Sequence, residues 1–313
     1  MRYIGELREG EMVSETYLCK SKQTMKTKAG KSYYSLLLQD KTGTLDAKVW
    51  DLSAGIDHFE SMDYIHIDGQ ITCFQNALQM NVKRIRRSQE GEYDPADFMP
   101  ITDKNIEEMY QSLLDYISSM TNPYVKKLAE SFFVDDKDFA KRFKNHSAAK
   151  SVHHGYIGGL LEHTLAVTNL CNYLAQNYPI INRDILLASA MFHDIGKLVE
   201  LSTFPENDYT DEGQLLGHII IGSQQVSQRI DTIANFPGKL KNELIHCILA
   251  HHGELEYGSP KKPATVEALA LSYADNTDAK LQTMKEALAA GDEKLDWVGY
   301  NRFFETNIRR SGC

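Results

Sequence analysis

The sequence predicts a protein of two parts, a small five-stranded β-barrel followed by an all-α helical bundle. Short runs rich in β-branched and aromatic residues fill residues 12–87 and are separated by turn-forming residues. From residue 103 to about residue 290, apolar residues recur at the spacing of a helix. The stretch 89–102 between these regions is polar and contains proline, which is typical of a connection. We therefore expect domains at 1–88 and 103–313, joined by a linker at 89–102.

The barrel prediction rests on the number and spacing of the β-rich runs. Each run is short, and lysine, glycine or asparagine marks the turns between them. A barrel of this size is typical of the OB fold, which binds single strands or oligosaccharides on one face and with its loops. The runs predicted as strands are residues 12–19, 32–40, 44–50, 64–74 and 77–85.

Basic and aromatic residues of the barrel are candidates for contact with a nucleic acid. Lysines crowd the first predicted hairpin loop, and further basic residues follow the last strand. Positive charge along a phosphate backbone, with rings that stack on bases, holds single strands without reading their sequence. A solvated turn and core aromatics are the alternative, and only one of Tyr33 and Tyr34 can face a ligand, since neighbours on a strand point to opposite sides. The predicted contacts are Lys22, Lys26, Lys28, Lys31, Tyr33, Trp50, Lys83, Arg84 and Arg86.

The second part is expected to form a helical bundle. Thr102 or Asp103 can cap its first helix, ahead of an apolar stripe. The loop 201–213 is expected to be a surface excursion beside the candidate site described next, either covering a substrate or serving only as a connector. The predicted helices span residues 103–120, 122–133, 136–145, 158–177, 182–199, 214–234, 238–251, 263–288 and 301–309.

Histidine and aspartate side chains lie on or beside the apolar stripes of these helices. His163 falls on one stripe and Asp275 continues another, so both point inward. The adjacent His193 and Asp194 directly follow a helical segment that is apolar on almost all sides, which indicates a buried position. Burial of an unpaired carboxylate costs several kcal/mol, so a metal ion is its natural partner. Mixed imidazole and carboxylate ligands favour Mn, Fe, Zn or Co over an all-oxygen Mg or Ca site. The predicted ligands are His163, His193, Asp194, His218, His251 and Asp275, while His252 either joins them or faces the substrate.

This arrangement resembles the HD-domain superfamily of metal-dependent phosphohydrolases. Its pattern is a helical histidine, an adjacent His-Asp pair and a later aspartate, which here are His163, His193-Asp194 and Asp275. The string HDIGK, the strings HHGYIGGLLEHT, GQLLGHI and HHGELEYGSPKKPATVEA, and the preceding barrel look like the bacterial YhaM-type 3′-5′ exoribonucleases over nearly the whole chain. The resemblance implies two metal ions bridged by Asp194, with manganese expected and iron, cobalt, magnesium or zinc as alternatives.

The resemblance also implies a reaction, the hydrolysis of phosphodiester bonds in single-stranded RNA by metal-bound hydroxide, with single-stranded DNA as a further substrate. Lys197 is expected either to contact a phosphate oxygen or to be an ordinary solvent-facing lysine. His154 is expected to contact substrate or to act as an acid for the leaving 3′-oxygen, and the spacing does not choose between it and His153. Two other classes stay open: an HD phosphohydrolase of a small nucleotide or cyclic dinucleotide, and a non-catalytic RNA-binding protein with a structural metal.

Composition sets broad limits. The 313 residues are 42% hydrophobic, enough to bury the cores of two domains, and no run of about 18 apolar residues or apolar N-terminal signal is present. We therefore expect a cytoplasmic protein without membrane contact, and a homo-oligomer remains open. Five cysteines without CxxC spacing indicate neither a disulfide framework nor a zinc knuckle. The net charge of −9 lies mostly in the second part, because residues 1–90 hold 13 basic and 12 acidic residues, so RNA binding by the barrel is not excluded.

Overall fold

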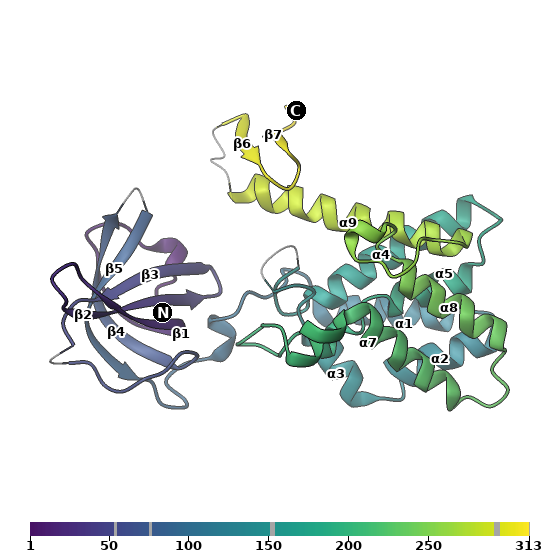
Figure 1. Cartoon of the computed structure of the whole chain (residues 1–313), viewed down its shortest axis with the longest axis horizontal. Helices are drawn as coiled ribbons and strands as arrows, with labels where there is room; N and C mark the ends of the chain where they lie inside the picture. The colour runs from purple at the N-terminus through teal and green to yellow at the C-terminus, as the bar shows by residue number, and fades with distance from the viewer. Residues whose placement is uncertain (53–54, 75–76, 151–153, 291–294, 313) are drawn as a thin grey trace. The chain divides into compact units, whose positions relative to one another are not determined.

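The structure is a computed structural model that describes every residue except 53–54, 75–76, 151–153, 291–294 and 313. The chain divides into two compact units, Met1–Ile101 with Phe204–Glu206 and Thr102–Thr203 with Asn207–Cys313. The first unit contains a closed β-barrel and the second a bundle of helices (Figure 1). The predicted fold class is therefore confirmed, whereas the exact boundaries at residues 88 and 102 stay predictions.

The described strands of the barrel are β1 (Met12–Lys26), β2 (Ser32–Asp40), β3 (Gly43–Val49), β4 (Tyr64–Phe74) and β5 (Ala77–Arg87). They close in the order β1-β2-β3-β5-β4, with β3 and β5 parallel and the other neighbours antiparallel. β1 makes closure possible because it pairs with β4 along Met12–Leu18 and with β2 along Leu18–Lys26, and a bulge between Cys19 and Ser21 bends it. A five-stranded barrel connected in this way is of the OB type.

β1 extends beyond the predicted strand 12–19 into the lysine-rich segment. Residues 21–26 are mostly polar and lack the alternation that marks a strand in the sequence, yet they pair with β2. The first hairpin turn is therefore confined to residues 27–31, where Gly30 adopts φ +81°. Several lysines predicted in a loop instead lie in a strand, where pairing fixes their directions.

The described helices are α1 (Ile106–Ser118), α2 (Pro123–Phe133), α3 (Lys137–Asn145), α4 (Gly159–Asn177), α5 (Arg183–Phe192), α6 (Lys197–Glu200), α7 (Asp211–Asp231), α8 (Gly238–Ala250) and α9 (Val266–Ala290). Asparagine side chains cap several of them: Asn105, Asn122 and Asn182 accept hydrogen bonds from backbone N–H groups of the first turns of α1, α2 and α5. Every residue of α5 from Asp184 to Phe192 is buried, and α2, α4, α8 and α9 pack around it. The bundle is thus organised around α5.

The prediction of one continuous helix over residues 182–199 is wrong, because the structure has two helices separated by a turn. α5 ends at Phe192, residues 193–196 form a turn, and α6 begins at Lys197. The backbone of this turn packs directly on α7, because a Cβ on Gly196 would lie 2.0 Å from the carbonyl oxygen of His218. Only glycine leaves room for this approach, and the turn places His193 and Asp194 at the end of the buried helix.

The predicted helix 301–309 is also wrong. After α9 the chain forms an antiparallel hairpin of β6 (Trp297–Asn301) and β7 (Thr306–Arg309), visible beside the C-terminus in Figure 1. Trp297, Tyr300 and Ile308 are residue types that favour strands, and a stretch of this length is too short for periodicity alone to decide.

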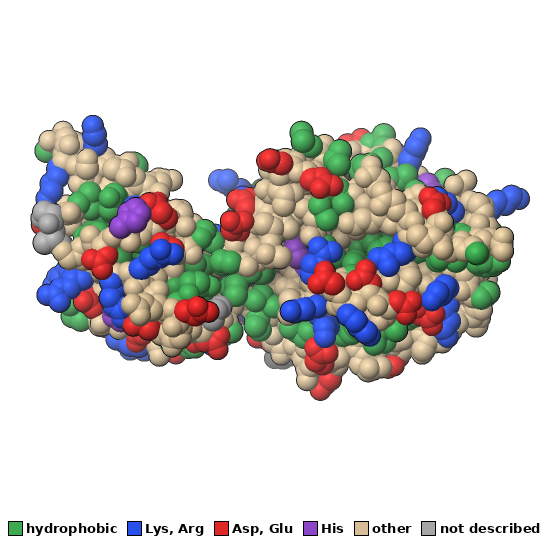
Figure 2. Space-filling model, turned by 90° about the horizontal axis from the view of Figure 1, so that it is seen from below, with side chains coloured by type: hydrophobic (Ala, Val, Ile, Leu, Met, Phe, Trp, Pro, Cys, Tyr) green, Lys and Arg blue, Asp and Glu red, His purple; other side chains and the backbone are tan. Residues whose placement is uncertain are grey.

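The surface carries both signs of charge. Figure 2 shows lysine and arginine side chains interspersed with aspartate and glutamate on the visible face of each unit, without a broad field of one sign. None of the described helices is long and apolar enough to span a bilayer.

Gly196→Ala should destabilise the helical unit, since the new methyl group would meet backbone atoms that cannot move aside. The backbone at Gly196 is helical, with φ −61° and ψ −20°, so space alone excludes a side chain. We expect the free energy of unfolding to fall by about 3 kcal/mol. Gly238→Ala is the matched control, because a Cβ there meets nothing within 4 Å and the change should stay within about 0.5 kcal/mol. Equal melting temperatures for the two variants would contradict the tight packing at Gly196.

Candidate metal centre

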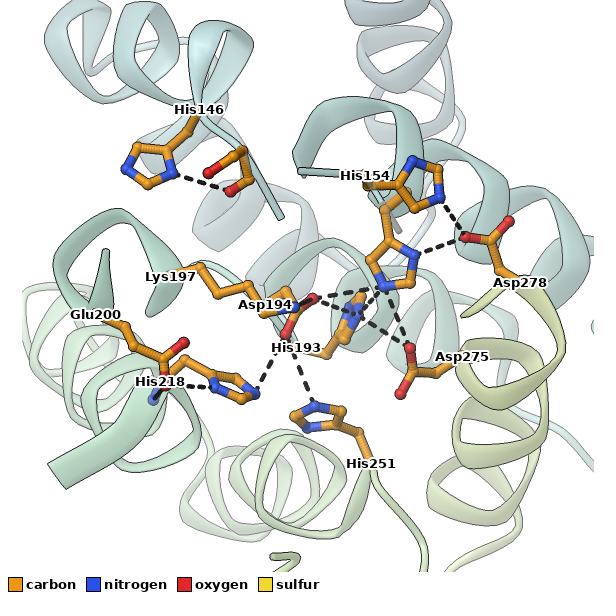
Figure 3. Close-up of polar contacts among 12 residues, drawn as sticks. His146, His154, His193, Asp194, Lys197, Glu200, His218, His251, Asp275 and Asp278 are labelled. Carbon is orange, nitrogen blue, oxygen red and sulfur yellow. Dashed lines mark hydrogen bonds and ion pairs between the residues drawn. The ribbon is translucent and has the colours of Figure 1, made fainter. Parts of the chain in front are cut away.

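Every ligand predicted from the sequence is brought to one place in the helical unit (Figure 3). In Figure 3 the labelled side chains of His193, His218, His251 and Asp275 gather around Asp194, and His163 joins them with its Nε2 atom 3.4 Å from Asp194 Oδ2. Their burial is high: His193 and His251 are completely buried, and Asp194 is 2% exposed. His163 lies on α4, His193 caps α5, Asp194 is in the turn that follows, His218 lies on α7, His251 caps α8 and Asp275 lies on α9.

Four ligand atoms form a first set. His163 Nε2 lies 3.2 Å from both His193 Nε2 and Asp275 Oδ1. Asp194 Oδ2 lies 3.4 Å from each of the two histidine Nε2 atoms. His193 Nε2 and Asp275 Oδ1 lie 3.8 Å apart. The centre of a tetrahedron with edges of about 3.2 to 3.8 Å is about 2.0 to 2.3 Å from each corner, close to the length of metal–nitrogen and metal–oxygen bonds. The set therefore fits one divalent ion.

The other oxygen of Asp194 faces a second set. Oδ1 lies 3.5 Å from His218 Nε2 and 3.8 Å from His251 Nε2. All three atoms are buried and accept or donate no hydrogen bond within the described part of the chain, which is a costly state for polar atoms. His252 lies close by, since one ligand atom from each of His218, His251 and His252 falls within 4.8 Å of the others. The set fits a second ion, with Asp194 between the two.

Backbone carbonyls hold two of the ligand histidines in position. Nδ1 of His193 donates to the carbonyl of Ala190, and Nδ1 of His251 donates to that of Ile248, both at 2.7 Å. Because a carbonyl only accepts, Nδ1 must carry the proton, and Nε2 of a neutral ring keeps its lone pair toward the centre. Such outer hydrogen bonds orient ligating histidines in metal sites.

Carboxylates hold two other histidines. His163 Nδ1 donates to Asp278 Oδ2 at 2.7 Å. Glu200 Oε1 accepts from His218 Nδ1 and from the backbone N–H of His218, both at 2.9 Å. That N–H is available because α7 breaks at Gly217, which has φ +75° and ψ 156°. The break thus aims His218 into the site.

Neither Asp278 nor Glu200 was predicted from the sequence. Asp278 follows Asp275 by three residues on α9, and Glu200 follows Lys197 by three. Residues at this spacing share one face of a helix, so an acid three positions after a predicted site residue was the available signal.

The charges of the site favour a bound cation. Burial alone would raise the pKa of Asp194, but the Lys197 ammonium lowers it well below the ordinary value. Burial opposes a charge on His163, but carboxylates including Asp275 outweigh it and raise the pKa of His163 to about 9. Burial lowers the pKa of His251 well below its ordinary value. Asp194 is therefore ionised and His251 neutral, the forms that bind metals, and the acids stabilise positive charge between them.

Lys197 and His154, the other predicted catalytic residues, both contact carboxylates. Lys197 Nζ lies 2.7 Å from Asp194 Oδ2, so the side chain faces the site rather than solvent, and its contact with a phosphate stays a prediction. His154 is 2% exposed and its Nε2 lies 3.1 Å from Asp278 Oδ2. These contacts favour a positioning role, and the role of His154 as an acid stays a prediction. His153 lies outside the described residues.

The loop 201–213 is tied to the bundle near both ends. Leu201 pairs with Tyr209, and the Thr210 side chain caps α7. These contacts are typical of a loop that connects two helices. That the loop covers a substrate stays a prediction.

The predicted basic contacts of the barrel differ in exposure. Lys22 is held within the barrel, because Nζ donates to the Phe59 carbonyl at 2.6 Å and lies 4.4 Å from the Phe59 ring. Arg86 is paired with both oxygens of Glu92, at 2.7 and 3.1 Å. The exposed members of the predicted set are Lys26, Lys28, Lys31, Lys83, Arg84 and Arg86, although Arg86 is already paired with Glu92.

Two predicted aromatic contacts lie together. The rings of Tyr33 and Trp50 stack with centroids 4.5 Å apart, and Trp50 is 46% exposed. The Trp50 ring nitrogen donates to Asn81 Oδ1 at 3.0 Å, which fixes the indole across neighbouring strands. Tyr34 points the other way and packs edge-on against Phe59. Of the two adjacent tyrosines, Tyr33 is therefore the one on the outer surface.

The chain was compared with known protein families, proteins and structures. The HD domain family matches residues 160–280. The 3′-5′ exoribonuclease YhaM of Geobacillus sp. (strain WCH70) is 34% identical over 281 residues, covering 89% of this chain and 86% of that protein. The HD domain of L. monocytogenes phosphodiesterase PgpH overlaps 56% of this chain and 77% of that chain, at 17% identity and TM-score 0.27. The second OB-fold domain of replication protein A from Methanococcus maripaludis overlaps 29% and 96%, at 20% identity and TM-score 0.22. Because both TM-scores are low, the fold assignment rests on the strand order, the helices and the HD match.

Asp278→Asn should weaken metal binding, because the amide holds the His163 ring less firmly than the carboxylate does. We expect the affinity for Mn²⁺ to fall by about 10- to 100-fold, measured by isothermal titration calorimetry. Asp138→Asn, which removes the same charge from a side chain that is 86% exposed, is the control and should bind as wild type. Wild-type affinity in Asp278→Asn would show that this carboxylate does not support the centre.

Proposed function

This chain belongs to the family of the YhaM 3′-5′ exoribonucleases, and we propose that it hydrolyses the phosphodiester bonds of single-stranded RNA from the 3′ end. The observation that carries the proposal is the ligand arrangement, in which Asp194 faces one set of ligand atoms with each oxygen. The HD match over residues 160–280 supports a metal-dependent phosphohydrolase.

The residues present fit two divalent ions. His163, His193 and Asp275 would hold one, His218 and His251 the other, and Asp194 would bridge them, with His252 as a further candidate. The mixed nitrogen and oxygen donors suit manganese, with iron, cobalt, magnesium and zinc as alternatives. When bound, such ions supply Lewis acidity toward a phosphate and lower the pKa of a coordinated water.

The chain's own residues prepare the site for that chemistry. Hydrogen bonds at Nδ1 fix the ligand rings in advance, so little reorganisation is needed when substrate arrives. Lys197 keeps a positive charge against Asp194 and lies where it can move to a phosphate oxygen. The depth of the ligands excludes bulk water, which strengthens each electrostatic contact.

The barrel supports RNA rather than a free nucleotide as substrate. The stacked rings of Tyr33 and Trp50 offer an aromatic platform, and Lys26, Lys28 and Lys31 lie exposed at the hairpin before Tyr33. A small nucleotide needs no such surface, whereas a single strand uses both features. Stacking and phosphate contacts do not require a 2′-hydroxyl, so the proposal extends to single-stranded DNA.

Asp194→Ala tests the bridging role. Removal of the carboxylate takes a ligand from both sets, so Mn²⁺-dependent hydrolysis should fall by about three orders of magnitude or more. The measurement uses single-stranded RNA labelled at its 5′ end, incubated with and without Mn²⁺, and a ladder that shortens from the 3′ end is expected for wild type. Asp138→Ala serves as the control and should retain full activity. A tenth or more of wild-type activity in Asp194→Ala, with metal still bound, would exclude the bridge.

Lys26, Lys28 and Lys31 changed together to Gln should flatten the salt dependence of RNA binding. Each phosphate neutralised in a single strand contributes about −0.7 to the slope of log K against log salt, so we expect a change of roughly 1 to 2 units. The measurement is a salt titration with fluorescent single-stranded RNA, with metal omitted to prevent cleavage. Lys127, Lys137 and Lys141, exposed on the helical unit, are changed to Gln as the control of equal charge. The same slope in both variants would mean that the hairpin does not contact the backbone.

A further inference from the structure

We propose that the helical unit holds a nucleobase beside the metal centre, in a pocket between the tyrosines Tyr257 and Tyr273. This inference rests on the proposed function, because it names the part of the RNA substrate that the pocket takes. The pocket encloses about 110 Å³, with walls from the loop after α8 and from the first half of α9. His252, one of whose ring nitrogens lies within 4.8 Å of ligand atoms of His218 and His251, lines it as well.

Two residues of the lining are direct neighbours of predicted ligands along the chain. His252 directly follows the ligand His251, and the lining residue Asn276 directly follows the ligand Asp275. A phosphate held by these ligands carries a nucleoside on each side, joined to it by a single ester bond. The base of one of these nucleosides is therefore within reach of the pocket.

The lining suits a flat ring. Tyr257 is 66% exposed and Tyr273 is 64% exposed, which is high for aromatic side chains at the wall of a pocket. Pro263 and Leu269 add further apolar surface. Aromatic rings stack on every base, because each base has a π-face, whereas a charged phosphate gains little from such a wall. A nucleobase is thus the part of RNA that this lining recognises.

The backbone at Tyr257 also supports the metal centre. Its carbonyl accepts a hydrogen bond from His252 Nδ1 at 2.8 Å. The segment that carries the tyrosine ring therefore orients His252, and a base stacked on the ring would hold this segment in place.

The charges around the pocket permit a polyanion. Glu254 brings a carboxylate to the lining, but Lys262 Nζ lies 2.6 Å from it and offsets its charge. The exposed amide of Asn276 offers a donor and an acceptor to the edge of a base. The pocket thus combines a stacking surface with a neutral polar edge.

The test compares RNA strands that differ by one base. Three 5′-labelled single strands are used, one intact, one abasic at the 3′-terminal nucleotide and one abasic at the penultimate nucleotide. The rate of the first cleavage is measured for wild type, Tyr273→Ala and Tyr273→Phe. Tyr173→Ala is the matched control, since this tyrosine also lies within a helix and is 63% exposed.

Wild type should cleave one abasic strand about 5- to 150-fold more slowly than the intact strand, as expected for the loss of one stacked base. Tyr273→Ala should bring this ratio close to 1, while Tyr273→Phe and Tyr173→Ala keep it. Equal slowing of all strands by Tyr273→Ala would indicate a merely structural role and overturn the proposal, as would a wild type indifferent to both abasic sites. A wild type that cleaves no intact RNA would overturn the proposed function, and the pocket proposal with it.

Discussion

The helical unit depends on the burial of one carboxylate, that of Asp194. Its side chain is 2% exposed, and its two oxygens face different groups of histidine nitrogens. An ionised carboxylate without partners at this depth would cost several kcal/mol, so the surrounding elements must supply positive charge and donors. Lys197 supplies one ammonium, and the histidine and aspartate groups beside the carboxylate could hold a metal cation as well. The turn that carries Asp194 is possible because Gly196 lets α7 approach its backbone.

The polar contacts around Asp194 continue outward through the helical unit as a series of acidic and donor side chains. Asp278, which holds a ligand histidine, also contacts His154, and His154 bonds the hydroxyl of Tyr156 at 2.9 Å. That hydroxyl donates to Glu162 at 3.1 Å, and Lys104 lies 3.0 Å from the same carboxylate. A chain of polar contacts thus runs from the ligands to a lysine that is 58% exposed. Such a satisfied network keeps its members in one arrangement, which is what fixed ligand geometry requires.

The sequence was sufficient to predict the two-part fold and to select the residues that meet at the centre, because histidine and aspartate on apolar stripes have few places to point. It was insufficient for Asp278 and Glu200, since an acid on a helix looks like an ordinary solvated residue until the histidine beside it is known. Lys22 was predicted in a hairpin loop and instead lies in β1, because that part of the strand is polar and lacks the usual alternation. The hairpin at 297–309 was missed because short segments carry too little periodicity.

The burial of the candidate metal centre and the exposed aromatic rings beside it together limit which phosphodiester bonds can reach the centre. The ligand side chains are nearly or fully buried, so a phosphodiester reaches them only when its neighbouring nucleotides leave their stack. Unstacking costs about a few kcal/mol in a duplex, and less at a strand that is already single. A free end carries a nucleotide on one side of the last phosphate only, so it enters with the least rearrangement. Rings such as Tyr257 and Tyr273, placed where that unstacking occurs, would restore part of the lost stacking energy, and this favours the end of a single strand over any internal position.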